Sequence, residues 1–143
     1  ARYLILWNFG GLYIDLDICI IKEKSIGFLF DKDYFFVKWH NDKRKLPYNA
    51  VLGTKKNTDL YKNILDHSKE SYYEKRKQSI YKQWKGRFVF QTTGHFMLKR
   101  VLKKNKIENY MDIMKIHTKT GETIQGKNPL FEDSNASIWY DGN

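Results

Sequence analysis

The chain has few of the residues that crosslink or interrupt a fold. Its 143 residues include one cysteine, Cys19, and two prolines, Pro47 and Pro129. A single thiol excludes an internal disulfide and a cysteine-based zinc cluster. No linker rich in Ser, Gly or Pro, no repeat and no low-complexity tract divides the sequence. We therefore expect one domain, or part of one.

Long apolar runs are also missing. No run approaches the roughly 20 residues that a helix needs to cross a bilayer. The chain opens at Ala1 without Met and without a leader sequence, so we expect a truncated start. Localisation is left open. We expect a soluble portion without a transmembrane segment, cytoplasmic or membrane-associated if the full-length protein carries an anchor.

Positive charge is in excess and lies in the middle of the chain. Lys and Arg number 26 against 16 Asp and Glu, which gives a net charge of +10, and the excess falls within residues 22–110. Such a surface could attract nucleic acid, an anionic membrane surface or a phosphorylated small molecule. A solvated basic face without a partner is the plainer explanation. No nucleic-acid-binding motif occurs, so nucleic acid is not expected as a partner.

The first twenty residues have the clearest pattern. Arg2 to Phe9 is apolar enough for a helix, which Gly10 and Gly11 would end. From 12 to 20 the pattern has a period of two, which predicts one strand. Its core-facing side would carry Ile14, Leu16, Ile18 and Ile20, and its other side Tyr13, Asp15, Asp17 and Cys19.

Further elements alternate between strand and helix patterns, which predicts the α/β class. Extended segments are expected at 34–39, 49–53, 87–91 and around 119–122. One helix, in one or two pieces, is expected at 58–85 and would be stopped by Gly86. Another helix is expected from a cap at Thr92 or Thr93 to Lys104. The second helix would bury Met97, Leu98, Val101 and Leu102.

Asp15 and Asp17 are the sharpest chemical feature. Two carboxylates separated by one residue project from the same side of a strand. They could share Mg²⁺ or Mn²⁺, which take oxygen ligands completed by water and substrate phosphates. Such a site suits the departure of a diphosphate. The alternative is a pair of acids on a solvated strand face.

Residues 1–17, which end in Gly10-Gly11-Leu12-Tyr13-Ile14-Asp15-Leu16-Asp17, resemble the sugar-binding DXD region of the family-32 glycosyltransferases. That family includes Och1-like and inositol-phosphorylceramide mannosyltransferases and is related to the clostridial glucosylating toxins. Asn49-Ala50-Val51-Leu52-Gly53 is similar to the family's Asn-Ala segment, and residues 92–98 are similar to its Thr-Gly-Pro motif, with His95 in place of the proline. The resemblance covers most of residues 1–102.

The resemblance implies a role for each matching residue. Arg2 would bind hydroxyls of the donor sugar, for which a planar guanidinium is suited. Asp15 would contact ribose and sugar hydroxyls, and Asp17 would ligate the metal. Tyr13 would line the donor pocket, and Asn49 would hydrogen-bond the sugar or the acceptor.

The end of the chain resembles the toxins' terminal loop. Ser137 and Trp139 match its Ser-x-Trp, whose side chains reach the donor diphosphate. A third metal ligand is not evident, and the candidates are Asp141, Asn143 and Asn135. Three histidines are expected to be surface or structural residues: His40, His67 and His117.

Together these features imply that residues 1–143 are the C-terminal part of a GT-A-type catalytic domain that lacks the N-terminal nucleotide-binding strands. The expected enzyme is a retaining glycosyltransferase that depends on Mn²⁺ or Mg²⁺, with Asp15 and Asp17 as catalytic residues. It would move a hexose from a nucleotide-diphosphate sugar to a glycan or glycolipid hydroxyl. The alternatives are a basic module that binds nucleic acid or an anionic surface, and an inactive glycosyltransferase remnant.

Overall fold

The computed structural model describes residues 1–21, 26–39, 45–77, 85–117 and 121–134. Its helices are α1 (Arg2–Phe9), α2 (Asp59–Arg76), α4 (Lys85–Thr92) and α5 (His95–Lys104), with a short 3₁₀ helix η1 (Gly27–Leu29). Its strands are β1 (Gly11–Ile14), β2 (Ile18–Ile20), β3 (Tyr34–Lys38), β4 (Pro47–Thr54), β5 (Met114–His117), β6 (Thr123–Gln125) and β7 (Phe131–Asp133). The α/β class is confirmed at this level.

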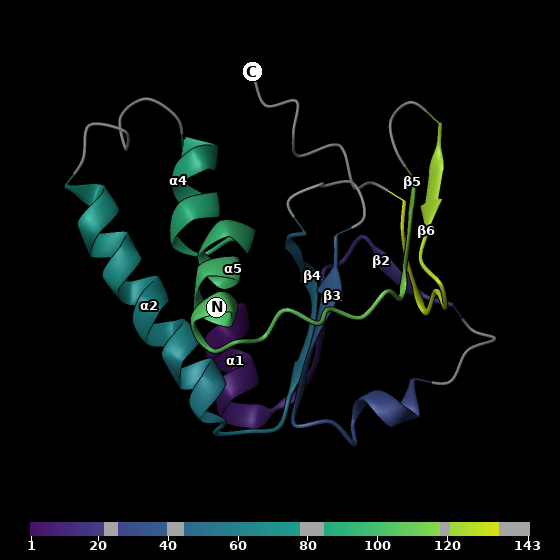
Figure 1. Cartoon of the computed structure of the whole chain (residues 1–143), viewed down its shortest axis with the longest axis horizontal. Coiled ribbons are helices and arrows are strands. Elements are labelled where there is room, and N and C mark those ends of the chain that lie inside the picture. The colour runs from purple at the N-terminus through teal and green to yellow at the C-terminus, as the bar shows by residue number, and fades with distance from the viewer. Residues whose placement is uncertain (22–25, 40–44, 78–84, 118–120, 135–143) are drawn as a thin grey trace.

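The strands form two sheets. The first has the order β1-β4-β3 and is antiparallel throughout. The second has the order β2-β7-β5-β6, in which β5 and β7 run parallel. In Figure 1 helices α1, α2, α4 and α5 lie on one side of β3 and β4, and the second sheet lies on the other. The first sheet is therefore the middle layer of the molecule.

Two hydrophobic cores hold these layers together. The helix-side core packs α1, α2 and α5 on one face of the first sheet, and consists of Tyr3, Leu6, Phe36, Leu52, Leu60, Tyr61, Ile64, Met97, Leu98, Val101 and Leu102. The inter-sheet core lies between the two sheets, and consists of Ile18, Leu29, Phe35, Val37, Tyr48, Ala50, Val51, Ile113, Met114, Ile116, Leu130 and Phe131. β4 contributes to both cores, so it is covered on both faces.

The helix expected at Arg2–Phe9 is confirmed, and so is its end. Gly10 has φ +69° and Gly11 φ +95°, a region that L-residues rarely adopt. The Gly10 amide donates to the Leu6 carbonyl. A Cβ at Gly10 would approach the Lys56 amide nitrogen within 2.7 Å. Glycine therefore lets α1 turn sharply and enter β1 beside the end of β4.

The single strand predicted for 12–20 is wrong. β1 ends at Ile14, Asp15 to Asp17 form a turn, and β2 begins at Ile18 in the other sheet. Leu16, expected in the core, is fully exposed at 107%. The apolar and polar residues continue to alternate through the turn, but the backbone is not extended there. Asp is favoured at the first position of such a turn.

The strand predicted for 87–91 is also wrong, because these residues lie in α4. Phe88 and Thr92, one helical turn apart, are buried against α2, where the Phe88 and Tyr72 ring centroids are 5.6 Å apart. Packing at a helical spacing thus overrides the strand propensity of an aromatic, β-branched segment. Gly86, expected to stop the preceding helix, lies inside α4.

The remaining elements are close to expectation. β3 and β4 confirm the extended segments at 34–39 and 49–53, and α5 buries its predicted apolar stripe. The N-cap of α5 is Gly94, not Thr92 or Thr93, whose hydroxyls donate back to carbonyls of α4. α2 confirms the first part of the helix predicted for 58–85, and residues 78–84 lie outside the described residues.

Towards the C-terminus, short strands are expected around 119–122. The observed strands β5 and β6 lie on either side of these residues and pair antiparallel. Gly121 and Glu122 are not in a strand, and residues 118–120 lie outside the described residues. Within the described ranges, no helix is both long enough and apolar enough to cross a membrane.

The turn at Leu16 can be tested by comparing Leu16→Asp with Ile18→Asp. Leu16→Asp should change the free energy of unfolding by no more than about 0.5 kcal/mol, because the side chain is in solvent. Ile18→Asp should cost several kcal/mol, because it buries an unpaired charge in the inter-sheet core. Urea unfolding measures both. Equal, large losses of unfolding free energy in both variants would show that Leu16 is buried and would support a single strand through 12–20.

Candidate functional site

The candidate site is built at the point where the chain passes from the first sheet to the second. The Asp15 amide donates to the Ala50 carbonyl over 2.9 Å, which holds the start of the turn on β4. The Ile18 amide donates to the Asp15 carbonyl over 3.1 Å and closes the turn. Asp15 and Asp17 are half-buried on either side of exposed Leu16.

Arg2 connects three elements at this turn. It lies in the first turn of α1, and its Nη1 is 3.2 Å from a carboxylate oxygen of Asp15. The same Nη1 donates to the backbone carbonyl of Asn49 in β4 over 2.6 Å. Its guanidinium carbon lies 4.8 Å from the centroid of the Tyr13 ring in β1. One side chain thus fixes α1, β1 and β4 relative to the acid.

Tyr13 completes this cluster from the end of β1. Its hydroxyl donates to the Asp15 carboxylate over 2.5 Å. Burial and this hydrogen bond raise the pKa of the Tyr13 phenol, and the positive charge of Arg2 partly offsets them. The phenol therefore remains protonated at neutral pH and acts as a donor to Asp15. Tyr13 and Asp15 share a side of the chain, as the period of two predicts.

A second tyrosine lies behind the turn. Tyr48 of β4 donates a hydrogen bond to Asp133 of β7, a residue only 1% exposed. Burial, this hydrogen bond and the negative charge of Asp133 raise the pKa of Tyr48, and the charges of Asp17 and Asp15 add to the effect. The Tyr48 phenol is thus a neutral donor among three carboxylates.

Asp17 differs from Asp15 in its surroundings. Within the described part of the chain its carboxylate makes no hydrogen bond or ion pair, although its charge raises the pKa of Tyr48. Half-buried and without a protein donor, it is suited to accept a cation. No group of three His, Cys, Asp or Glu side chains that could hold a metal ion occurs among the described residues.

The structure brings together four of the residues that the sequence singled out. Arg2, Tyr13 and Asp15 contact one another, and the backbone carbonyl of Asn49 accepts a hydrogen bond from Arg2. Asp17 lies at the other end of the same turn. The expected shared strand face of Asp15 and Asp17 is wrong, because residues 15–17 form a turn between two strands. Five candidates lie outside the described residues: Asn135, Ser137, Trp139, Asp141 and Asn143.

The histidines lie away from this turn or outside the described residues. His95, which stands where the resembling motif has proline, is buried, with its ring centroid 5.3 Å from that of Trp39 and 4.9 Å from that of Phe90. His117 contacts Glu132 across β5 and β7 at 2.5 Å, and hydrogen bonds from His117 and then Lys115 lower the pKa of Glu132. His67 is half-buried on α2, and His40 is outside the described ranges.

Sequence reasoning missed Tyr48 and Asp133. Asp133 faces Ile18 across the second sheet, and it is 85 residues from Tyr48 along the chain. The local signal for Asp133 was an acid at the end of a short Phe-Glu-Asp alternation, which predicts a strand with an inward carboxylate. Nothing in the sequence near Tyr48 indicates its partner, because the contact depends on how the two sheets pack.

The Tyr13–Asp15 contact can be tested through the phenol. Asp15→Asn should lower the pKa of Tyr13 towards its ordinary value, because it removes the negative charge that favours the protonated phenol. The measurement is a phenolate absorbance titration of wild type and Asp15→Asn, each subtracted from its Tyr13→Phe counterpart. Asp66→Asn, an exposed acid paired with Lys62, is the control. An unchanged or higher pKa in Asp15→Asn would contradict the contact.

Comparison of the chain with protein-family models, with curated proteins and with solved structures finds no match to any of them.

Proposed function

We propose that this chain is the donor-binding part of a metal-dependent, retaining glycosyltransferase of GT-A type, similar to the family-32 enzymes. It would transfer a hexose from a nucleotide-diphosphate sugar to a hydroxyl of a glycan or glycolipid. The observation that carries the proposal is the contact of Arg2, Tyr13 and Asp15 at the carbonyl of Asn49. The sequence resemblance selects the same three side chains, and it also selects Asn49, which contributes its backbone carbonyl.

Asp15 and Arg2 are suited to bind sugar hydroxyls. A carboxylate offers about four acceptor positions, and Arg2 and Tyr13 use only part of them. Arg2 carries five N–H donors, and its contacts with Asp15 and Asn49 engage Nη1. Because both groups are held by neighbours, the remaining acceptors and donors are fixed in direction before a ligand arrives.

Asp17 is the metal ligand in this proposal. When bound there, Mn²⁺ or Mg²⁺ supplies positive charge that neutralises the departing diphosphate. Asp15 keeps its contacts with Arg2 and Tyr13 and orients the sugar, so the two acids have separate tasks. Tyr48 and Asp133 lie behind the turn and hold β4 against β7, which fixes the backbone on which Asp17 stands.

We expect metal affinity to depend on Asp17 more than on Asp15. Asp17→Asn should weaken Mn²⁺ binding by at least about tenfold, because it removes the one carboxylate of the turn that has no protein donor. Asp15→Asn should have a smaller effect. Titration of Mn²⁺ followed by electron paramagnetic resonance measures both, with Asp66→Asn as control. Undiminished affinity in both variants would rule out this metal site.

Donor binding tests the proposed function itself. Saturation-transfer NMR with UDP-glucose and with GDP-mannose, in the presence of Mg²⁺, should show contact of the sugar protons with the wild-type chain. Arg2→Ala should lose at least about tenfold in affinity for the donor, because removal of a charged hydrogen-bond donor costs about 1.5–3 kcal/mol. Binding without release of the nucleotide would identify an inactive remnant. Equal binding by Arg2→Ala and wild type would contradict the proposed donor site.

A further inference from the structure

A hollow of about 400 Å³ lies at the other end of the first sheet from the candidate site. It is lined by aromatic and basic side chains from the end of α1, the segment after η1 and the end of β4. The register of β1 on β4 places Gly11 beside Thr54 at this end. Four strand residues, or roughly 13 Å, separate it from Asp15.

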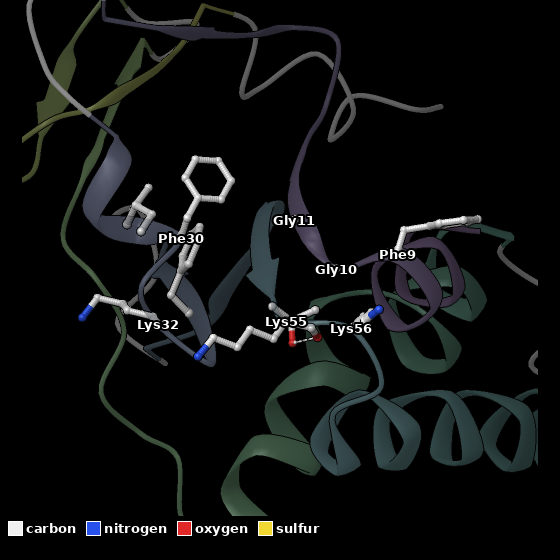
Figure 2. Close-up of a pocket in the computed structure, with 10 residues that line it drawn as sticks. Phe9, Gly10, Gly11, Phe30, Lys32, Lys55 and Lys56 are labelled. Atoms are coloured by element: carbon white, nitrogen blue, oxygen red, sulfur yellow. Dashed lines mark hydrogen bonds between the residues drawn. The ribbon is translucent and has the colours of Figure 1, made fainter.

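The rim of the hollow carries apolar rings that protrude into solvent. Phe9, the last residue of α1, is 80% exposed, and Phe30, just after η1, is 53% exposed. Figure 2 shows the two rings on opposite sides of Gly10 and Gly11. Phe28 in η1 and Ile5 in α1 are also exposed, at 45% and 51%. Exposed aromatic rings that gather in this way mark an interaction surface.

Lysines accompany these rings. Among the described residues, Lys32, Lys55 and Lys56 line the hollow, and no acid does. Lys55 pairs with Asp33 over 2.8 Å. Asp31, between Phe30 and Lys32 in the sequence, is a second exposed acid of this segment, so the three lysines outnumber the acids by one. Within the described part of the chain, Lys32 and Lys56 form no ion pair, and their ammonium groups extend from the two sides of the Lys55 backbone in Figure 2. Two cationic groups thus remain available beside two apolar rings.

We propose that this edge docks on an anionic membrane surface, with the rings of Phe9 and Phe30 among the lipid chains near the interface. Lys32 and Lys56 would bind phosphate oxygens of the headgroups. The combination of exposed rings and lysines favours this occupant, because stable membrane attachment needs both an apolar and a basic signal. A single-stranded nucleic acid could also stack its bases on exposed rings, so RNA is the competitor in the experiment below. The inference does not rest on the proposed function. Docking at this edge leaves Asp15 and Asp17 free, because they lie at the far end of β1.

Co-sedimentation of the chain with lipid vesicles tests this proposal. Vesicles of phosphatidylcholine mixed with phosphatidylserine should bind the chain, and vesicles of phosphatidylcholine alone should bind it far less. Phe9→Ser and Phe30→Ser should each weaken binding by about tenfold, through loss of the inserted ring. Lys32→Gln and Lys56→Gln should each weaken it by about fivefold and reduce its dependence on salt.

Matched controls come from α2 and α5, whose residues do not line the hollow. Tyr73→Ser on α2 removes a ring as exposed as that of Phe30, and the pair Lys103→Gln and Lys104→Gln on α5 removes exposed charges. These variants should bind as wild type does. If Phe30→Ser does not fold, Phe9→Ser decides alone, because Phe9 is almost fully in solvent.

Three results would overturn the proposal. Equal binding to neutral and anionic vesicles would remove the role of the lysines. Equal losses in the control and test variants would show diffuse attraction to the whole basic surface. Release of the bound chain by an RNA oligonucleotide, with Phe9→Ser as tightly bound as wild type, would identify a nucleic-acid surface instead.

Discussion

The burial of β4 on both faces is the constraint on which the rest of the structure depends. Val51 and Leu52, neighbours in the middle of the strand, are completely buried, one in the inter-sheet core and the other in the helix-side core. A strand covered in this way cannot slip by one residue without exchanging its two sets of side chains. Its register therefore sets the position of everything attached to it.

Both the candidate site and the hollow are attached to β4. At one end of the strand, the Asn49 carbonyl accepts a hydrogen bond from Arg2 and the Ala50 carbonyl accepts one from the Asp15 amide, while Tyr48 donates one to Asp133. At the other end, Thr54 and the two lysines that follow it line the hollow. Backbone groups make several of these contacts, so they are independent of the side chains that β4 carries. The strand thus holds a polar turn and a basic, aromatic edge at a constant separation.

The parts of this fold that the sequence predicts well are those whose signal is local. The two glycines after Phe9 mark the end of α1, and the spacing of Met97, Leu98, Val101 and Leu102 marks the buried face of α5. Both features depend on neighbours within a turn or two of the same helix. Asp15 was singled out by its Asp-x-Asp pattern and Arg2 by the resemblance, and the structure pairs the two.

The failures arise where distant packing decides. The alternation from Ile14 to Ile20 is unbroken, yet Ile18 pairs with Asp133 in a second sheet, and that pairing is formed by residues more than a hundred positions away. The segment Arg87–Gln91 has the composition of a strand, but burial of Phe88 against α2 favours a helix. Tyr48 and Asp133 could not be paired from sequence, since neither lies near the other's pattern.

The change of sheet between Asp15 and Asp17 has a mechanical consequence. Asp15 is anchored to β4 in the first sheet, and Asp17 adjoins β2 in the second, so a displacement of one sheet against the other would strain the turn that carries both acids. The side chains packed between the sheets resist such a displacement, because a dense interior yields little to strain. Residues of the inter-sheet core such as Val37 and Met114 thereby help to keep the turn in one conformation.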